Sequence, residues 1–370
     1  MEQKKERSNT IDIVKAIMII SVVIYHLIYR QMHGMFDNII REMIYLSMPL
    51  FFLFAGAFYK DDGDSFLKSL RKRLRKMLVM VLITTAVLLV LFGPYYILVY
   101  DEFTSKNWLG DILQTYLRPE LMAIILPDMT GEQLFNNISP VWFIWALAFA
   151  TMVFFAVMRV VKDDNKKMFI SIAVLLIVGA VCQEMIPHFS WSIQLAPFYA
   201  GIMMIGLALR RYDALEKIKK INLGLSTVIM IVAGVIHYFI FMKLGSDCIY
   251  QSILGDHGYL SDLMFVVQIF FGGFVLVTLA RIIDLSEYSK LAFAWVGRHT
   301  LVILIFHCLL GGIAMDIMHA YNKPGPYWYL DPLPTSVVVK SVISFVVGFG
   351  GCVALAVIND KLKAKYKKTK

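Results

Sequence analysis

The sequence is poor in charged residues. Only 17% of its 370 residues are Asp, Glu, Lys or Arg, whereas soluble domains carry about 25%. A chain with 59% apolar residues and so few charges cannot cover one soluble core with a polar surface, which excludes an ordinary soluble domain. Disordered chains are excluded as well, because they contain far fewer apolar residues. The composition therefore predicts a multi-spanning membrane protein.

Paired cysteines, repeats and linkers are also lacking. The four cysteines are scattered singly, at Cys182, Cys248, Cys308 and Cys352. Their spacing matches neither a disulfide framework nor a metal motif, so we expect no metal. Without a repeat or a low-complexity linker, we expect a single integral-membrane domain over 1–370. We expect an outer loop at about 101–139 and no appended soluble domain.

The chain contains ten apolar stretches long enough to cross a bilayer as helices, each of about 20 residues. The sequence therefore predicts an all-α polytopic membrane protein with about ten transmembrane helices. The stretches lie at roughly 10–30, 38–59, 77–100, 140–158, 168–187, 191–209, 222–243, 260–280, 299–319 and 334–358.

The positions of Lys and Arg predict the orientation. With the N-terminus in the cytoplasm, the inside segments hold 28 of the 36 Lys and Arg residues. Both termini are therefore expected to be cytoplasmic. The formal net charge of +9 follows the spans, so it gives no support for binding nucleic acid.

The first span carries ionisable residues where lipid-facing sequence is apolar. Asp12, Lys15 and His26 form a stripe, and Lys15 and His26 share a face because they are three helical turns, about 16 Å, apart. Ionisable residues inside spans are functional candidates by default. The alternatives are an ion pair between Asp12 and Lys15, and a packed His26 that binds a neighbouring helix.

Polar residues also occur in other spans. His307 lies near the middle of the ninth span, and Gly311 one turn later would let another helix approach closely. Three further residues lie in the outer halves of their spans and could line a polar cavity open to the outside, although each alone is more typical of packing or of the membrane interface: Glu184, Gln194 and His237. Trp142 is also typical of the aromatic belt at the membrane interface. These four residues are the predicted substrate contacts.

A basic block over 68–76 contains Arg71, Arg73 and Arg75. Such a block usually anchors the topology, but it could also attract anionic lipid or a phosphorylated cofactor.

The first span resembles the opening signature of the membrane-bound acyltransferase 3 family, which O-acylates cell-surface carbohydrates. The similarity runs from Arg7 through Ile11-Asp12 and Lys15-Ala16 to His26. Two positions depart from the family pattern, since Lys15 replaces the more usual Arg and Ala16 replaces a Gly. The Lys keeps the charge but loses bidentate hydrogen bonding. With Lys at this position and no appended outer domain expected, the chain most resembles the fucose-4-O-acetylase-like subgroup.

Later segments of the chain resemble the same family in the same order. They are Met48 to Gly56, the basic run 68–76, Pro140 to Trp145, Ala196 to Gly201, and Gly297-Arg298-His299-Thr300 continuing to His307.

The resemblance implies an O-acyltransferase of a bacterial plasma membrane. Its donor would be acyl-CoA, most simply acetyl-CoA, on the cytoplasmic side, held by Lys15, Arg71, Arg73 and Arg75. Its acceptor would be a carbohydrate hydroxyl at the outer face.

A hydroxyl needs a base that is neutral near physiological pH, and histidine suits that work. His26 is the expected general base or transient acyl carrier. His307 would position the acceptor or stabilise the oxyanion, and Asp12 would orient Lys15. One alternative class is a transporter or flippase for an envelope glycan intermediate, which would also contain many spans and buried polar residues. A second alternative is a non-enzymatic envelope assembly or sensor protein, which would need no buried histidine near the middle of the membrane. The sequence leaves the acceptor sugar and the oligomeric state open.

Overall fold

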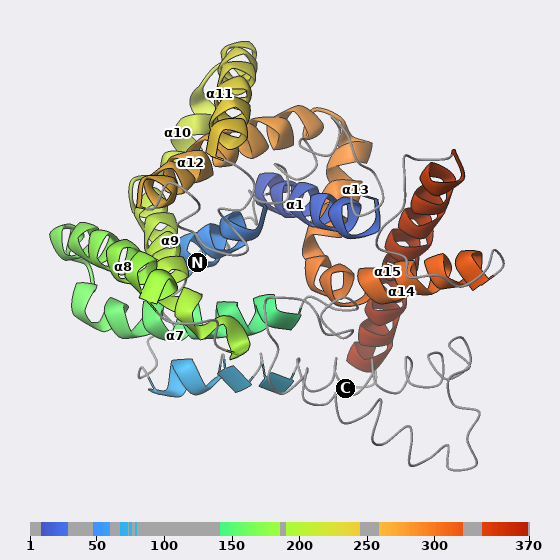
Figure 1. The fold of residues 1–370 in the computed structure, drawn as a ribbon, viewed down its shortest axis with the longest axis horizontal. Coiled ribbons are helices and arrows are strands. Elements are labelled where there is room, and N and C mark those ends of the chain that lie inside the picture. Colours follow the sequence, from blue (N-terminus) through green and yellow to red (C-terminus); the bar gives the residue numbers. More distant parts are fainter. Residues whose placement is uncertain are drawn as a thin grey trace.

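The structure is a computed structural model, and it describes residues 9–28, 47–59, 67–72, 74–75, 78–79, 141–185, 190–244, 259–320 and 335–368. Its described residues form helices and turns without any strand. Figure 1 shows the elements α1 (Asn9–Leu27), α7 (Val141–Val161), α8 (Asn165–Met185), η3 (Ser190–Leu195), α9 (Ala196–Arg211), α10 (Ala214–Lys220), α11 (Leu223–Leu244), α12 (Tyr259–Ile283), α13 (Glu287–Arg298), α14 (Thr300–Ala320) and α15 (Thr335–Lys368).

Six of the described helices are long and apolar enough to cross a membrane, and two bent pairs raise the number to eight. The bent pairs are α10 with α11, at 115°, and α13 with α14, at 79°. The prediction of an all-α polytopic membrane protein is confirmed. These eight correspond to eight of the ten predicted spans. Of the other two predicted spans, 38–59 contains a shorter apolar helix, Ser47–Ala57. The span 77–100 lies outside the described residues except for 78–79. The predicted outer loop 101–139 also lies outside the described residues.

Helix α1 is the centre of the packing. It contacts α12, α13, α14 and α15, and Figure 1 shows it in the middle of the molecule. Most of its side chains are buried, including the polar residues Thr10, Asp12 and Ser21. A helix that is buried on nearly all sides is enclosed by other helices rather than by lipid.

Helix α13 is an addition to the sequence prediction, which treated residues 281–298 only as an inside segment. It begins at an N-cap, where the Ser286 hydroxyl accepts a hydrogen bond from the Ser289 amide, as Ser often does at this position. It ends against α1, because Gly297 lies so close to the Asp12 carbonyl that a Cβ would overlap it. Glycine permits this backbone contact.

The helix Ser47–Ala57 packs against α9 through another glycine pair. Gly56 faces the backbone of Met203, and Gly206 faces the backbone of Leu53. Nearby, the rings of Phe52 and Tyr199 stack with their centroids 4.0 Å apart. Small residues at such a crossing let two helix backbones approach closely, which is a common way to associate helices within a membrane.

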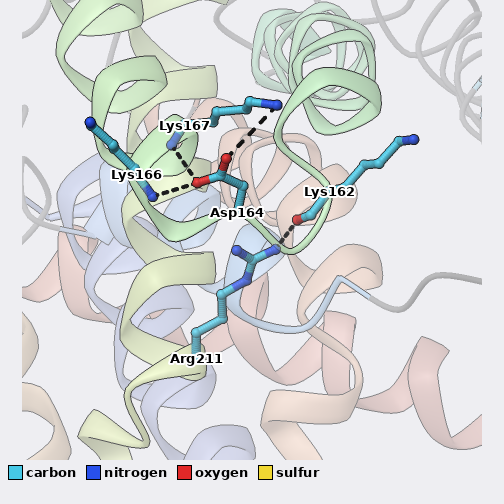
Figure 2. Close-up of polar contacts among 5 residues, drawn as sticks. All are labelled: Lys162, Asp164, Lys166, Lys167 and Arg211. Carbon is cyan, nitrogen blue, oxygen red and sulfur yellow. Dashed lines mark hydrogen bonds and ion pairs between the residues drawn. The ribbon is translucent and has the colours of Figure 1, made fainter.

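The helix ends on the predicted cytoplasmic side contact one another. At the α7–α8 turn, Asp164 Oδ1 accepts hydrogen bonds from the backbone amides of Lys166 and Lys167, at 2.9 and 3.1 Å. These bonds satisfy free amides at the start of α8. Arg211, at the end of α9, donates to the carbonyl of Lys162 (Figure 2). Lys162 itself has a φ of 44° and is therefore in the left-handed region.

A second contact on this side holds the bend between α10 and α11. The Arg281 guanidinium, near the end of α12, donates to the carbonyls of Ile218 and Ile221, at 3.1 and 2.8 Å, and to the Ser226 hydroxyl, at 2.8 Å. Both carbonyls lie where the chain turns between α10 and α11, and the Ile218 carbonyl also accepts a hydrogen bond from the Ile221 amide at 3.2 Å. One arginine therefore ties the end of α12 to both sides of the bend.

A third contact joins the start of α14 to the end of α15. His299 Nδ1 donates to the Trp295 carbonyl at 2.8 Å, and His299 Nε2 lies 3.0 Å from an Asp360 carboxylate oxygen. All three contacts join helix ends that the Lys and Arg distribution assigns to the same side, so the packing agrees with the predicted alternation of spans.

Candidate functional site

Two histidines from distant parts of the sequence meet inside the helix bundle. His26 lies in the last turn of α1, and His307 lies in α14. Their ring centroids are 5.3 Å apart, with an angle of 57° between the ring planes. The structure therefore brings together the two histidines to which the sequence assigned catalytic roles.

A seam of small residues explains how α1, α14 and α15 come so close. The Leu27 side chain, next to His26, lies against both Gly311 on α14 and Gly348 on α15. The Ser344 hydroxyl of α15 also donates to the Gly311 carbonyl at 2.8 Å. A side chain at either glycine would occupy the space of Leu27, so the glycines determine how far the two rings are from one another.

His307 is completely buried, and its hydrogen bonds define its tautomer. Its Nδ1 lies 2.8 Å from the Ile303 carbonyl, and because a carbonyl only accepts, Nδ1 carries the proton. In the neutral ring, Nε2 then has a free electron pair. This Nε2 lies 3.2 Å from the Cys308 sulfur. The hydrogen bond to the backbone fixes both the ring orientation and which nitrogen can accept a proton.

His26 is half-buried, so it is the more accessible of the two rings. The ring of Tyr25 lies edge-on to it, with the centroids 5.2 Å apart. One nitrogen of His26, one of His307 and the Cys308 sulfur all lie within 4.8 Å of one another. The site thus combines one accessible imidazole, one buried imidazole and a buried thiol.

Asp12 and Lys15 lie at the other end of α1. Asp12 is fourteen residues before His26, which is about 21 Å along the helix axis, and its side chain is buried beside α13. The Lys15 ammonium lies 5.7 Å from the ring centroid of Phe58, a cation–π contact. The structure therefore separates these two residues from the histidine pair.

The other predicted site residues are only partly described. Arg71 and Arg75 are exposed on a short helical segment, and Arg73 lies outside the described residues. Gln194 is buried in η3, and its side-chain carbonyl oxygen has no hydrogen-bond partner among the described residues. For three residues the structure describes the backbone helix and not the side chain: Trp142 in α7, Glu184 in α8 and His237 in α11.

Sequence reasoning missed two residues that lie beside the predicted site groups. Cys308 was treated only as a scattered cysteine, although its position next to His307 was visible. Arg210 was counted only as a topology marker, but it donates to the Tyr59 carbonyl, one residue from the Phe58 ring that Lys15 contacts. The position of Arg210 at the end of a span was the available signal, and its partner depends on tertiary packing.

Comparison with known proteins identifies the class. The fold is that of a multi-pass helical membrane protein, and a family model described as an acyltransferase domain matches residues 8–358. Because the match covers nearly the whole sequence, the chain belongs to the acyltransferase 3 family and is a membrane acyltransferase. No curated protein and no solved structure gives a significant match.

Proposed function

We propose that this protein transfers an acyl group, most simply acetyl, from cytoplasmic acyl-CoA to a hydroxyl of a cell-surface or lipid-linked carbohydrate. The observation that carries the proposal is the pair His26 and His307, 5.3 Å apart inside the membrane domain of an acyltransferase. Within the family, the similarity of the first span favours the fucose-4-O-acetylase-like subgroup, in a bacterial plasma membrane.

His26 is the proposed general base. A sugar hydroxyl is a weak nucleophile and becomes effective when a positioned base removes its proton during attack. The hydroxyl oxygen attacks the thioester carbonyl, His26 takes the hydroxyl proton, and the carbon–sulfur bond breaks. The proton then passes to the departing CoA thiolate. The partial exposure of His26 supports this role, because the base must touch the acceptor.

His307 is the proposed positioning residue. Its Nδ1 proton is engaged by the Ile303 carbonyl, so the neutral ring presents only an acceptor at Nε2. Such a ring can accept a hydrogen bond but cannot donate one to an oxyanion. Of the two roles that the sequence left open, the geometry therefore favours positioning over oxyanion stabilisation.

The donor site is proposed at the Lys15 end of α1. CoA carries several negative charges, which cationic side chains attract. Lys15 and Arg210 flank the end of the helix Ser47–Ala57, and Arg71, Arg73 and Arg75 would extend the cationic surface. Lys15 and His26 are about 16 Å apart along α1, so the extended pantetheine arm would carry the thioester toward His26. Asp12 would orient Lys15.

The acceptor site is proposed on the outer side of His26. Gln194 is a proposed acceptor contact, because its buried side-chain carbonyl oxygen has no hydrogen-bond partner among the described residues and a sugar hydroxyl would satisfy it. Trp142, Glu184 and His237 complete the proposed acceptor contacts, since each belongs to the outer half of its predicted span.

The test compares the surface glycans of cells that express the wild type, His26→Ala or His26→Gln. We expect the mass increment of one acyl unit with the wild type and its loss with both variants, at equal membrane protein level. His299→Gln is the control, because it removes a histidine at the predicted cytoplasmic start of α14, about 12 Å along the axis from His307. An unchanged increment in both His26 variants would remove His26 from the mechanism.

The donor site has its own test. Acetyl-CoA binding by the purified protein should weaken with added salt and with Lys15→Ala, whereas Lys15→Arg should retain it. Binding that does not depend on salt would argue against an electrostatic donor site. Release of CoA thiol that depends on acceptor would also separate an acyltransferase from a transporter.

A further inference from the structure

We propose that His26, His307 and Cys308 form a transition-metal site suited to Zn²⁺, and that a metal ion bound there blocks acyl transfer. The metal site stands on its own geometry. Only the inhibitory effect rests on the proposed function.

The three donors converge from two helices on one point. The nearest ligand atoms of the three side chains lie within 4.8 Å of one another, and the Cys308 sulfur is already 3.2 Å from His307 Nε2. In a tetrahedral zinc site with bonds of about 2.0–2.3 Å, neighbouring ligand atoms are roughly 3.5 Å apart. Small side-chain rotations of His26 would therefore complete a three-ligand set.

The surroundings of His307 match those of a metal-binding histidine. Such histidines usually donate their other ring N–H to a carbonyl or carboxylate, which fixes the ring and leaves the coordinating nitrogen unprotonated. His307 does this through Nδ1 to the Ile303 carbonyl, at 2.8 Å. The arrangement orients Nε2 without further change of the helix.

The donor set selects the kind of metal. Two imidazoles and one thiolate favour Zn²⁺ and similar borderline-soft ions, whereas Mg²⁺ and Ca²⁺ prefer oxygen ligands. Binding would convert the Cys308 thiol to a thiolate and release one proton to solvent. The thiolate would neutralise part of the metal charge inside the bundle, and a fourth coordination position would remain open.

Metal binding and base catalysis exclude one another at this site. Zn²⁺ coordinates the imidazole through the same electron pair that would accept the hydroxyl proton. A metal-bound His26 is therefore unable to act as a base, and the consequence is reversible inhibition by zinc. The sequence could not show this site, because the ligands follow no metal-motif spacing and one of them comes from a distant helix.

The experiment uses the purified full chain in detergent, stripped of metal and titrated with Co²⁺ as a spectroscopic substitute for Zn²⁺. We expect one Co²⁺ per chain and a thiolate-to-cobalt charge-transfer band that Zn²⁺ abolishes by competition. Cys308→Ser should remove the band and weaken binding by more than the roughly 10–100-fold that loss of an outer-shell partner costs. Cys182→Ser is the matched control, because Cys182 lies in α8, and it should retain the band.

Zinc titration of acyl transfer tests the functional half. Zn²⁺ should inhibit the wild type, a chelator should restore its rate, and Cys308→Ser should need at least about tenfold more Zn²⁺ for the same fractional inhibition relative to its own metal-free rate. Absence of the cobalt band in the folded wild type, or its persistence in Cys308→Ser, would overturn the metal site. Equal zinc sensitivity of the two proteins would overturn the inhibitory role. A wild type that binds Co²⁺ through Cys308 but transfers no acyl group would instead refute the proposed function and leave the metal site standing.

Discussion

The close packing of α15 against the histidine site can be tested with a single methyl group at Gly348. A Cβ at this position would lie 2.6 Å from a Leu27 methyl, 3.0 Å from the His307 carbonyl oxygen and 3.1 Å from the Gly311 Cα. Ordinary van der Waals contact begins at 3.4 Å, so the three contacts are too short by about 0.8, 0.4 and 0.3 Å. The Leu27 methyl can rotate away, but the two backbone contacts yield only if α14 and α15 separate.

The expected effect of Gly348→Ala follows from this separation. Overpacking of this kind destabilises a protein by about 1–3 kcal/mol. Because the displaced backbone carries His307, the substitution also moves one ring of the pair by several tenths of an ångström. A misplacement of about 1 Å at a reacting centre can lower a rate by about 100-fold, so we expect a loss of about tenfold or more. The readouts are the thermal midpoint in detergent and the initial rate of acceptor-dependent CoA thiol release.

Gly350→Ala is the matched control on the same helix. A Cβ at Gly350 has no neighbour within 4 Å among the described residues, and alanine favours a helix over glycine by about 1 kcal/mol. This variant should therefore keep its rate and be as stable as the wild type or slightly more stable. Adding Leu27→Ala to Gly348→Ala should relieve only the nearest contact and recover part of the loss. If Gly348→Ala behaved like Gly350→Ala in both readouts, the packing account of the site would be wrong.

Three further substitutions test the contacts at the predicted cytoplasmic side. Gly297→Ala should lower the thermal midpoint strongly, because its Cβ would overlap the Asp12 carbonyl. Gly312→Ala is the control, since a Cβ there meets no described neighbour within 4 Å. Equal effects of the two substitutions would refute this contact. Arg281→Gln should destabilise the protein by about 1–3 kcal/mol, since the Ile218 and Ile221 carbonyls and the Ser226 hydroxyl lose the guanidinium as a partner. Faster hydrogen exchange at the start of α11 is the measurement, and unchanged exchange would contradict this expectation. Lys162→Gly should stabilise the α7–α8 turn by about 0.5–1 kcal/mol, because φ of 44° favours glycine, and a lower midpoint would show that the Lys side chain itself contributes.

The predicted spans and the packed helices agree because both follow from hydrophobicity. A helix that must satisfy its backbone within an apolar phase is recognisable from the run of apolar residues alone. The departures occur where packing overrides the local pattern. Residues 287–298 were read as part of an inside segment, yet they form α13, which the Gly297–Asp12 contact binds to α1. The apolar pattern also did not show the bends of 115° and 79°.

The candidate site was predictable in part for the same reason. His26 and His307 could be predicted as site residues because an ionisable residue inside an apolar run can be recognised from the sequence alone. Cys308 and Arg210 could not, because a cysteine in a span and an arginine at a span end are ordinary until their neighbours are known. Asp12 and His26 looked like members of one stripe, and the length of α1 places them at opposite ends of it.

The sequence by itself determined the class of the protein. Composition, span length and charge bias are properties of consecutive residues, and the bilayer selects for them directly. The sequence also marked the few ionisable residues whose burial demands an explanation. Only the tertiary structure decided which of them meet. The 5.3 Å separation of His26 and His307 depends on Leu27 lying against Gly311 and Gly348, three residues far apart along the chain. Such contacts arise from the complementary shapes of helix surfaces, and no local pattern of apolar residues encodes which surfaces pair.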